Sequence, residues 1–170
     1  IDKLTENDWR WVFDVNVMGT IHTVDAFLPL LRRSGGNRRV VVTSSSAAYL
    51  PGIRMAAYTT SKYAVTGYAE TLRMELAPEG IGVSILFPAG MSTSHIQSSQ
   101  RARPAALGAM MVDRDDIDAM MESRGIERDA HVATADHATR HLIAELASNA
   151  RYTFGLEASG IPQTPVAQRS

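Results

Sequence analysis

Apolar residues near the beginning of the chain recur every three or four positions over residues 9–31, and this spacing predicts an amphipathic helix. Thr5 and Asp8 stand three positions apart just before the pattern, which resembles a capping box with Asp in the place of Glu. A basic pair and then two glycines follow, so we expect the helix to end near residue 33. Gly19 and Pro29 are the positions where so long a helix could bend.

Two short apolar runs have the composition of strands rather than a helical spacing. Residues 40–42 are three consecutive valines, which is typical of a strand buried on both faces of a sheet, and residues 83–87 form a second such run. Between them, residues 56–77 repeat the helical spacing with small residues at the start. The order helix, strand, helix, strand therefore predicts an α/β fold, a Rossmann-like doubly wound parallel sheet with right-handed crossovers.

The rest of the chain is less regular. Five of the eight methionines fall between Met91 and Met121, so residues 91–112 are either a mobile lid over an apolar ligand or a loosely packed surface excursion. Short helices are expected at residues 115–124 and 134–148, and a last strand at residues 152–154. We therefore expect residues 1–155 to belong to a single domain and residues 156–170 to form an irregular tail.

Composition narrows the classes of protein to consider. Seventeen basic and eighteen acidic residues give a net charge of −1, which does not favour nucleic acid or an anionic membrane as a partner. The absence of cysteine excludes disulfides and thiolate chemistry and fits a reducing compartment. No apolar run approaches the roughly 18 residues of a membrane span, and no leader opens the chain, so the sequence predicts a soluble, cytoplasmic protein.

The stretch from Ser44 to Lys62 holds the candidate chemistry. Tyr58 and Lys62 are four positions apart at the start of the second predicted helix, hence on one helical face. A cation close to a phenol favours the phenolate, so such a pair is suited to proton transfer. Lys62 is also one of only two lysines in the chain. A lone Tyr-x-x-x-Lys often arises by chance, however, and alone it indicates little.

Two further features have two interpretations each. The serines 44–46 follow the first predicted strand, where ligands bind in open α/β sheets, but they could equally form a polar loop or a helix cap. Asn16 lies inside the first predicted helix, where its amide is either tolerated at a kink or required by a site. His137 and His141 have a spacing found in metal sites but lack the surrounding motif, so we expect no metal.

Together these residues resemble the C-terminal part of the short-chain dehydrogenase/reductase family. The family has an Asn-x-x-Gly motif in a helix, a Ser-Ser-x-Ala-Gly motif and a Tyr-x-x-x-Lys motif. Residues 16–19, 44–48 and 58–62 match them in the same order and spacing, with Ala48 in the place of the last glycine of the serine motif. The resemblance extends over about residues 1–95 and is looser to about residue 155.

The resemblance implies an NAD- or NADP-dependent oxidoreductase that interconverts a secondary alcohol and a ketone. Ser45 would hydrogen-bond the substrate oxygen and Tyr58 would act as general acid/base. Lys62 would hold the nicotinamide ribose, and Asn16 would anchor a water that connects Lys62 to solvent. The nicotinamide would be lined by the residues that align with the family's Pro-Gly-x-Val-x-Thr motif, in which Ala89 replaces the glycine: Pro88, Ala89, Gly90, Met91 and Thr93.

The residues themselves suggest a class of substrate, and the resemblance suggests an assembly. Four apolar residues, Tyr49, Leu50, Met91 and Ile96, suggest a pocket for a medium-sized hydrophobic alcohol. The family commonly forms dimers or tetramers through two long helices, which would be residues 6–33 and 57–77 here.

One part of the family pattern is not found. No glycine-rich turn of the kind that binds a dinucleotide pyrophosphate occurs in the 170 residues. The first strands of the family fold would precede Ile1, so we expect a fragment that is inactive alone and exposes a sheet edge. The alternatives are a non-catalytic relative that serves as an association module and, less favoured, an epimerase or dehydratase that uses the same Tyr-Lys pair.

Overall fold

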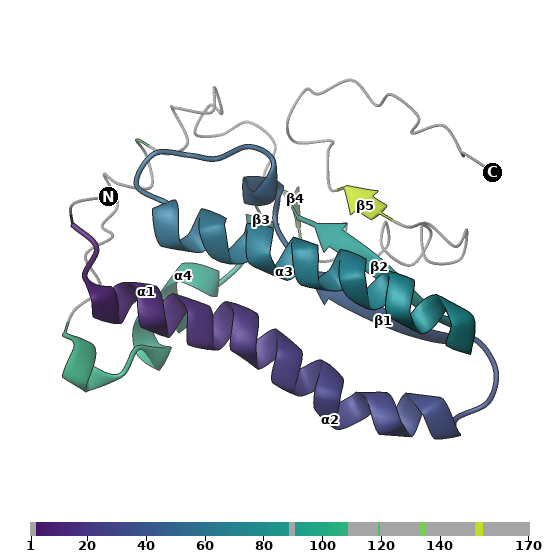
Figure 1. The fold of residues 1–170 in the computed structure, drawn as a ribbon. Coiled ribbons are helices and arrows are strands. Elements are labelled where there is room, and N and C mark those ends of the chain that lie inside the picture. The colour runs from purple at the N-terminus through teal and green to yellow at the C-terminus, as the bar shows by residue number, and fades with distance from the viewer. Residues whose placement is uncertain (1–2, 89–90, 109–118, 120–132, 135–151, 155–170) are drawn as a thin grey trace.

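A computed structural model describes residues 3–88, 91–108, 119, 133–134 and 152–154, and all structural statements below concern these residues (Figure 1). The main elements follow one another as helix, strand, helix, strand. In chain order they are α1 (Glu6–Phe13), a π-helical turn (Asp14–Met18), α2 (Gly19–Arg33), β1 (Arg38–Thr43), a 3₁₀ turn (Ser46–Ala48), α3 (Ala56–Leu76), a 3₁₀ turn (Ala77–Glu79), β2 (Ile81–Phe87), β3 (Met91–Ser92), α4 (His95–Ala102), a 3₁₀ turn (Ala105–Leu107), β4 (Ala133–Thr134) and β5 (Tyr152–Phe154).

The strands β1, β2 and β5 form a parallel sheet in the order β1-β2-β5. Val42 of β1 lies opposite Ile85 of β2, and Ile85 lies opposite Tyr152 of β5. The chain passes from β1 to β2 through α3, as a parallel pair requires. The predicted α/β fold with a parallel sheet is therefore confirmed, as are both predicted strands before residue 88 and the last one.

The helices α2 and α3 cover one face of this sheet (Figure 1). Near the carboxyl ends of the strands, Val65 and Ala69 of α3 pack with Val42, Ile85 and Phe87. Toward the other end, side chains from α2, α3 and β2 form a second cluster: Val24, Leu72, Leu76, Ile81 and Val83. Removal of these apolar surfaces from water holds the helices on the sheet and fixes the position of the start of α3 relative to the end of β1.

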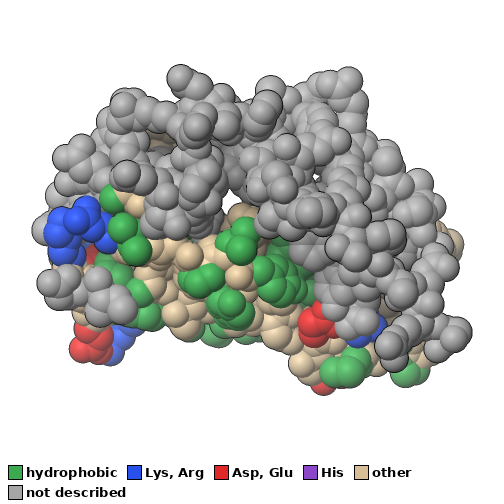
Figure 2. All heavy atoms as spheres, turned by 90° about the horizontal axis from the view of Figure 1, so that it is seen from above, with side chains coloured by type: hydrophobic (Ala, Val, Ile, Leu, Met, Phe, Trp, Pro, Cys, Tyr) green, Lys and Arg blue, Asp and Glu red, His purple; other side chains and the backbone are tan. Residues whose placement is uncertain are grey.

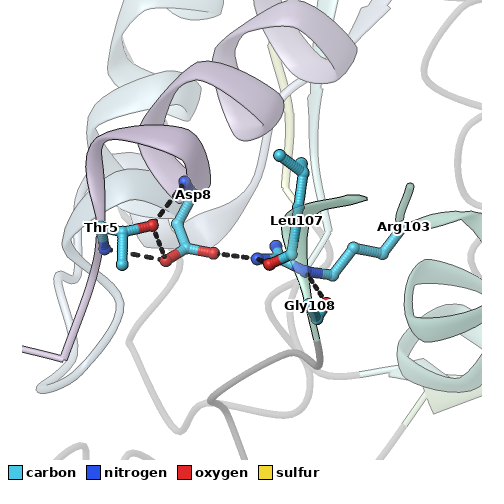
Figure 3. A network of polar contacts seen from close by, with 5 residues as sticks. All are labelled: Thr5, Asp8, Arg103, Leu107 and Gly108. Carbon is cyan, nitrogen blue, oxygen red and sulfur yellow. Dashed lines mark hydrogen bonds and ion pairs between the residues drawn. The ribbon is translucent and has the colours of Figure 1, made fainter. Parts of the chain in front are cut away.

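The first predicted helix has the expected limits but is interrupted. The capping box at its start is present, since Thr5 accepts a hydrogen bond from the backbone of Asp8 while the Asp8 carboxylate accepts one from the backbone of Thr5 (Figure 3). Residues Asp14–Met18 then form one wider π-helical turn. Asn16 lies at the centre of this turn, and the turn ends at Gly19, whose backbone N–H donates to the Asp14 carbonyl. Pro29 lies further on, inside α2. Single π-helical turns of this kind are frequent at functional sites.

The prediction that residues 40–42 are buried on both faces of the sheet is wrong for the described part of the chain. Val42 is 3% exposed, whereas its neighbour Val41 is 38% exposed. Successive side chains of a strand point to opposite faces, and α2 and α3 pack on the face of Val42 only. β1 also forms one edge of the three-stranded sheet among the described strands.

The region after β2 contains more structure than the sequence predicted. Residues 91–112 were expected to be irregular, but they include α4 and the strand β3, which pairs with β4. The helix α4 was missed because its sequence His-Ile-Gln-Ser-Ser-Gln-Arg-Ala has a single large apolar residue and hence no periodic apolar face. The helix predicted at residues 115–124 is described only at Ala119, and the tail at 156–170 falls outside the described residues. Of the helix predicted at residues 134–148 only Thr134 is described, and it belongs to the strand β4. In the described part of the chain, no helix has the length and apolar character needed to cross a membrane.

Candidate active site

The serine cluster follows β1 at the carboxyl edge of the sheet, and its three members have different surroundings. Ser44 is 2% exposed, and its hydroxyl lies 3.1 Å from the Lys62 carbonyl oxygen and 2.8 Å from the Thr66 hydroxyl. The backbone N–H of Ser46 donates to the Pro88 carbonyl over 2.9 Å. Ser44 thus attaches the end of β1 to α3, and Ser46 attaches it to the end of β2.

Ser45 lies between these two anchored residues and is partly exposed. Its backbone is extended, and its hydroxyl oxygen accepts a hydrogen bond from the Ala47 N–H over 3.1 Å, which caps the short 3₁₀ turn. A hydroxyl keeps its own proton and a second lone pair when it accepts one bond. Ser45 can therefore cap the turn and still donate to a ligand oxygen.

Tyr58 and Lys62 lie on one face in the first turns of α3. The Lys62 ammonium is 5.7 Å from the centre of the Tyr58 ring and donates a hydrogen bond to the Thr43 carbonyl over 3.2 Å. Burial of Lys62 lowers its pKa below the ordinary value of 10.5, because a partly dehydrated ammonium is less favourable than the neutral amine. The last carbonyl of β1 thus holds the lysine beside the tyrosine.

Asn16 reaches the same part of α3 from the π-helical turn. Its side-chain amide donates to the Ser61 hydroxyl over 3.0 Å, and that hydroxyl donates to the Tyr58 carbonyl over 2.7 Å. Ser61 is 0% exposed. The backbone carbonyl of Asn16 accepts a bond of 2.7 Å from the Thr20 hydroxyl. The structure thus connects Asn16 to the backbone of the candidate catalytic tyrosine through Ser61.

The sequence analysis assigned no role to Ser61 or to the Thr43 carbonyl. In the sequence, Ser61 was one of several small residues in the helical pattern. The only indication of a polar role was its hydroxyl, on a helical face whose other residues are suited to packing. The Thr43 carbonyl could not be recognised from a side-chain pattern, because it is a backbone group at the end of a strand.

The remaining predicted cofactor residues are only partly described. Pro88 is partly buried and is attached to Ser46, while Ala89 and Gly90 lie outside the described residues. The backbone of Met91 belongs to β3. The Thr93 hydroxyl accepts a bond of 3.3 Å from the His95 N–H at the start of α4. His137 and His141, the pair rejected as metal ligands, also lie outside the described residues.

The loop after the serine cluster presents apolar side chains. Tyr49, Leu50 and Ile53 are 50%, 42% and 51% exposed, and the ring centres of Tyr49 and Phe87 are 4.8 Å apart. Figure 2 shows hydrophobic side chains gathered in the middle of the described part of one face, between charged groups toward its two ends. Side chains of this kind beside a polar turn are suited to an apolar ligand with one polar end.

The donor set at the start of α3 fits a nicotinamide ribose. An ammonium has three N–H donors and no acceptor, and within the described residues the Lys62 ammonium donates one hydrogen bond, to the Thr43 carbonyl. The two remaining donors suit the adjacent hydroxyls of a ribose. The Tyr58 phenol and the Ser45 hydroxyl supply two further groups that bind oxygen.

Comparison with known proteins identifies the family. Residues 1–104, which are more than half of the chain, match the family described as "short chain dehydrogenase". The chain therefore belongs to the short-chain dehydrogenase/reductase family. The predicted resemblance is confirmed, and it covers the three motifs that hold the candidate site.

Three similar proteins show the range of relatives. Over 60% of its length the chain is 38% identical to the 3beta-hydroxysteroid dehydrogenase dhs-16 of Caenorhabditis elegans, and it covers 26% of that protein. Over 59% of its length it is 38% identical to the human 17-beta-hydroxysteroid dehydrogenase type 2, and it covers 25% of it. A short-chain dehydrogenase/reductase from Burkholderia phymatum, solved in complex with NAD, matches 91% of the chain with 31% identity and a TM-score of 0.76, while the chain covers 55% of that structure. The chain thus spans about a quarter of these two relatives and about half of the solved structure.

Proposed function

We propose that the protein of which these residues form part is an oxidoreductase that interconverts a secondary alcohol and a ketone with NAD or NADP. The observation that carries the proposal is the placement of Lys62, which the Thr43 carbonyl holds 5.7 Å from the Tyr58 ring at the carboxyl edge of the sheet. The family to which the chain belongs and the NAD bound by the Burkholderia relative support it.

In this proposal each residue acts through a stated atom. The Ser45 hydroxyl donates a hydrogen bond to the substrate oxygen, and the Tyr58 phenol gives that oxygen a proton in reduction or accepts one in oxidation. The Lys62 ammonium binds the ribose hydroxyls and lies beside the phenol. A nicotinamide dinucleotide, when bound, supplies or accepts the hydride, which no side chain can do.

The predicted role of Asn16 stays a proposal with one change of emphasis. Its side-chain amide bonds Ser61, so we propose that Asn16 acts chiefly by fixing the first turns of α3. A water bound between the π-helical turn and Lys62 is compatible with this arrangement. The lining of the nicotinamide by Pro88, Ala89, Gly90, Met91 and Thr93 also stays a proposal, as does the cytoplasmic location.

For the substrate we propose an apolar alcohol of about steroid size. Tyr49, Leu50 and Ile53 offer exposed apolar surface close to Ser45 in the sequence, and two relatives are named hydroxysteroid dehydrogenases. In the complete protein, Tyr49→Ala should raise the KM for a steroid alcohol while leaving that for a short alcohol such as 2-butanol nearly unchanged. An equal change in both KM values would contradict this substrate class.

We further propose that the protein assembles as a dimer or tetramer through its long helices. Several large apolar side chains on them are more than a third exposed: Val15, Met18, Phe27, Leu30, Tyr63 and Met74. Desolvation of such residues favours association. Multi-angle light scattering should report a dimer or larger for the complete protein and a shift toward monomer for Phe27→Lys.

The central test is Tyr58→Phe in the complete protein. Loss of the phenolic hydroxyl should lower kcat/KM by about 10²–10⁴-fold, with the fold retained. Tyr63→Phe is the matched control, because Tyr63 lies on the same helix and is 49% exposed. Isothermal titration with NADH and NADPH should show that Tyr58→Phe still binds the cofactor. Substantial turnover by Tyr58→Phe would exclude the assignment, and a complete protein that binds neither dinucleotide would favour the non-catalytic alternative.

A further inference from the structure

The backbone carbonyl oxygen of Lys62 lies within hydrogen-bonding distance of two side-chain hydroxyls that come from different elements. The Ser44 hydroxyl, directly after β1, is 3.1 Å from this oxygen, and the Thr66 hydroxyl, one turn further along α3, is 2.8 Å from it. The two hydroxyls are also 2.8 Å from each other. A residue at the end of the strand and two residues of the helix therefore form one compact group of three oxygens.

The number of available protons shows how this group is bonded. Each hydroxyl has one proton to donate, and the carbonyl can only accept. If the Ser44 hydroxyl donates to the Thr66 hydroxyl, the proton of Thr66 is left for the carbonyl. If the donation runs the other way, the proton of Ser44 is left for the carbonyl. Whenever both protons are used within the group, at least one hydroxyl therefore donates to the Lys62 carbonyl.

The regular structure of the strand and the helix does not require these bonds. The Ser44 N–H already donates to the Leu86 carbonyl over 2.8 Å, so the chain is attached to β2 at this residue. A threonine in a helix often bonds the carbonyl four residues earlier, as Thr71 bonds the Gly67 carbonyl over 3.1 Å. Thr71 is exposed and, within the described part of the chain, its hydroxyl bonds its own helix alone. Only the Thr66 hydroxyl of these two also meets a side chain at the end of β1.

Two consecutive residues at the end of β1 contact the two ends of Lys62. The Thr43 carbonyl accepts a hydrogen bond from the ammonium over 3.2 Å, and the Ser44 hydroxyl lies against the backbone of the same lysine. A lysine side chain is long and flexible, so contact at only one of its ends would leave it many conformers. Because both ends are bound to the same part of β1, the ammonium is held in one place, beside the Tyr58 ring.

We propose that Ser44 and Thr66 are positioning residues for Lys62, whose backbone their hydroxyls hold against the end of β1. The ammonium then stays at the Thr43 carbonyl, where it can bind a ribose. For its effect on the cofactor, the proposal rests on the oxidoreductase function given above. Neither hydroxyl touches the reacting atoms. The two residues act on cofactor affinity through Lys62, and the hydrogen bond that Ser45 offers to the substrate does not depend on them.

Cofactor binding by the complete protein tests this role. The variant Ser44→Ala/Thr66→Val removes both hydroxyls and should raise the Kd for the dinucleotide about 10-fold or more in isothermal titration, because the ammonium loses its fixed position. The substrate KM at saturating cofactor should stay within about twofold. Thr71→Val, the matched control, removes a hydroxyl from the same helix and should change neither constant. Thr66→Ser keeps the hydroxyl and should bind the cofactor like the wild type.

The magnetic resonance signal of the Lys62 side chain provides a readout that needs neither cofactor nor turnover. In protein made with isotope-labelled lysine, the Cε signal of Lys62 is identified by its absence in Lys62→Arg. In the double variant this signal should move toward that of the exposed Lys3, while Thr71→Val should leave it in place. If the double variant does not fold, Thr66→Val alone takes its place and should raise the Kd at least about threefold.

The possible results separate this proposal from the proposed function. An unchanged Cε signal in the double variant would show that the hydroxyls do not position Lys62. A displaced signal with an unchanged cofactor Kd, or an equal rise in the cofactor Kd and the substrate KM, would overturn the specific effect on the cofactor. If the wild type binds neither NADH nor NADPH, the proposed function fails, and the Cε signal still decides whether the two hydroxyls position Lys62.

Discussion

The side-chain amide of Asn16 donates a hydrogen bond to the hydroxyl of Ser61 over 3.0 Å, and this bond joins a π-helical turn to the first turns of α3. Ser61 passes the contact to the Tyr58 carbonyl over 2.7 Å. The backbone position of the proposed general acid/base therefore depends on a residue that comes more than forty positions earlier in the chain. Removal of either side chain should therefore change the backbone position of Tyr58.

We predict that Asn16→Ala and Ser61→Ala are coupled. Ser61→Ala leaves the Asn16 amide without its acceptor and should lower the free energy of unfolding by about 1–3 kcal/mol. The double variant should lose less than the sum of the single variants, with a coupling energy of at least about 0.5 kcal/mol in urea unfolding. Ser34→Ala is the control, because the Ser34 hydroxyl is exposed and bonds only the end of α2. Strict additivity of Asn16→Ala and Ser61→Ala would mean that the bond has no energetic role.

At alkaline pH, Lys62 should make the free energy of unfolding rise with pH. Burial lowers its pKa from 10.5, so between the lowered value and 10.5 the unfolded chain binds more protons than the folded protein. The free energy of unfolding that Lys62 contributes must then rise with pH in that interval. The rise should appear as a difference between the wild type and Lys62→Met in urea unfolding at a series of alkaline pH values. Lys3→Met, which alters the other, exposed lysine, should retain the slope of the wild type.

Asp8 should likewise make the free energy of unfolding rise with pH, but in the acid range. Burial alone would raise its pKa, but bonds from the Thr5 hydroxyl and backbone and from Arg103 outweigh this, so the net pKa lies below 3.8. Its contribution to stability is therefore complete above 3.8 and is lost as the pH falls through the lowered folded value. The stability difference between the wild type and Asp8→Asn should shrink over this interval. Asp25→Asn, at an exposed position on α2, serves as the control. If the stability difference between the wild type and Asp8→Asn stays constant with pH, the charge of the Asp8 carboxylate does not contribute to stability.

Gly67, inside α3, and Gly80, which follows the 3₁₀ turn after α3, should respond to alanine with opposite changes in stability. Gly80 has a φ of +67°, a left-handed conformation in which a side chain is strained, so Gly80→Ala should cost about 1–2 kcal/mol. Gly67 lies inside α3, and a Cβ placed there meets nothing within 4 Å, so Gly67→Ala should stabilise the protein by about 0.5–1 kcal/mol. Thermal or urea unfolding of the two variants checks both signs. Destabilisation by Gly67→Ala would indicate that another surface approaches the helix at this point.

The sequence was sufficient where local chemistry decides the structure. Thr5 and Asp8 indicated the start of the first helix. The valine run and residues 83–87 indicated two strands, and the spacing of Tyr58 and Lys62 placed both residues on one helical face. Such features depend on neighbours within a few positions, so a pattern of residue types is enough to predict them. The motif order also sufficed to recognise the family.

Other features were decided only by the tertiary structure. The exposure of Val41 depends on which helices cover each face of the sheet, and the fold of α4 depends on contacts that its polar sequence does not reveal. Ser61 and the Thr43 carbonyl became part of the site because packing brings α3 against the π-helical turn and β1. The ion pair of Asp8 and Arg103 joins residues 95 positions apart, and no local pattern specifies a contact at that separation. The sequence by itself thus determined which groups are available for chemistry, and the packing of distant segments decided which of them are held together.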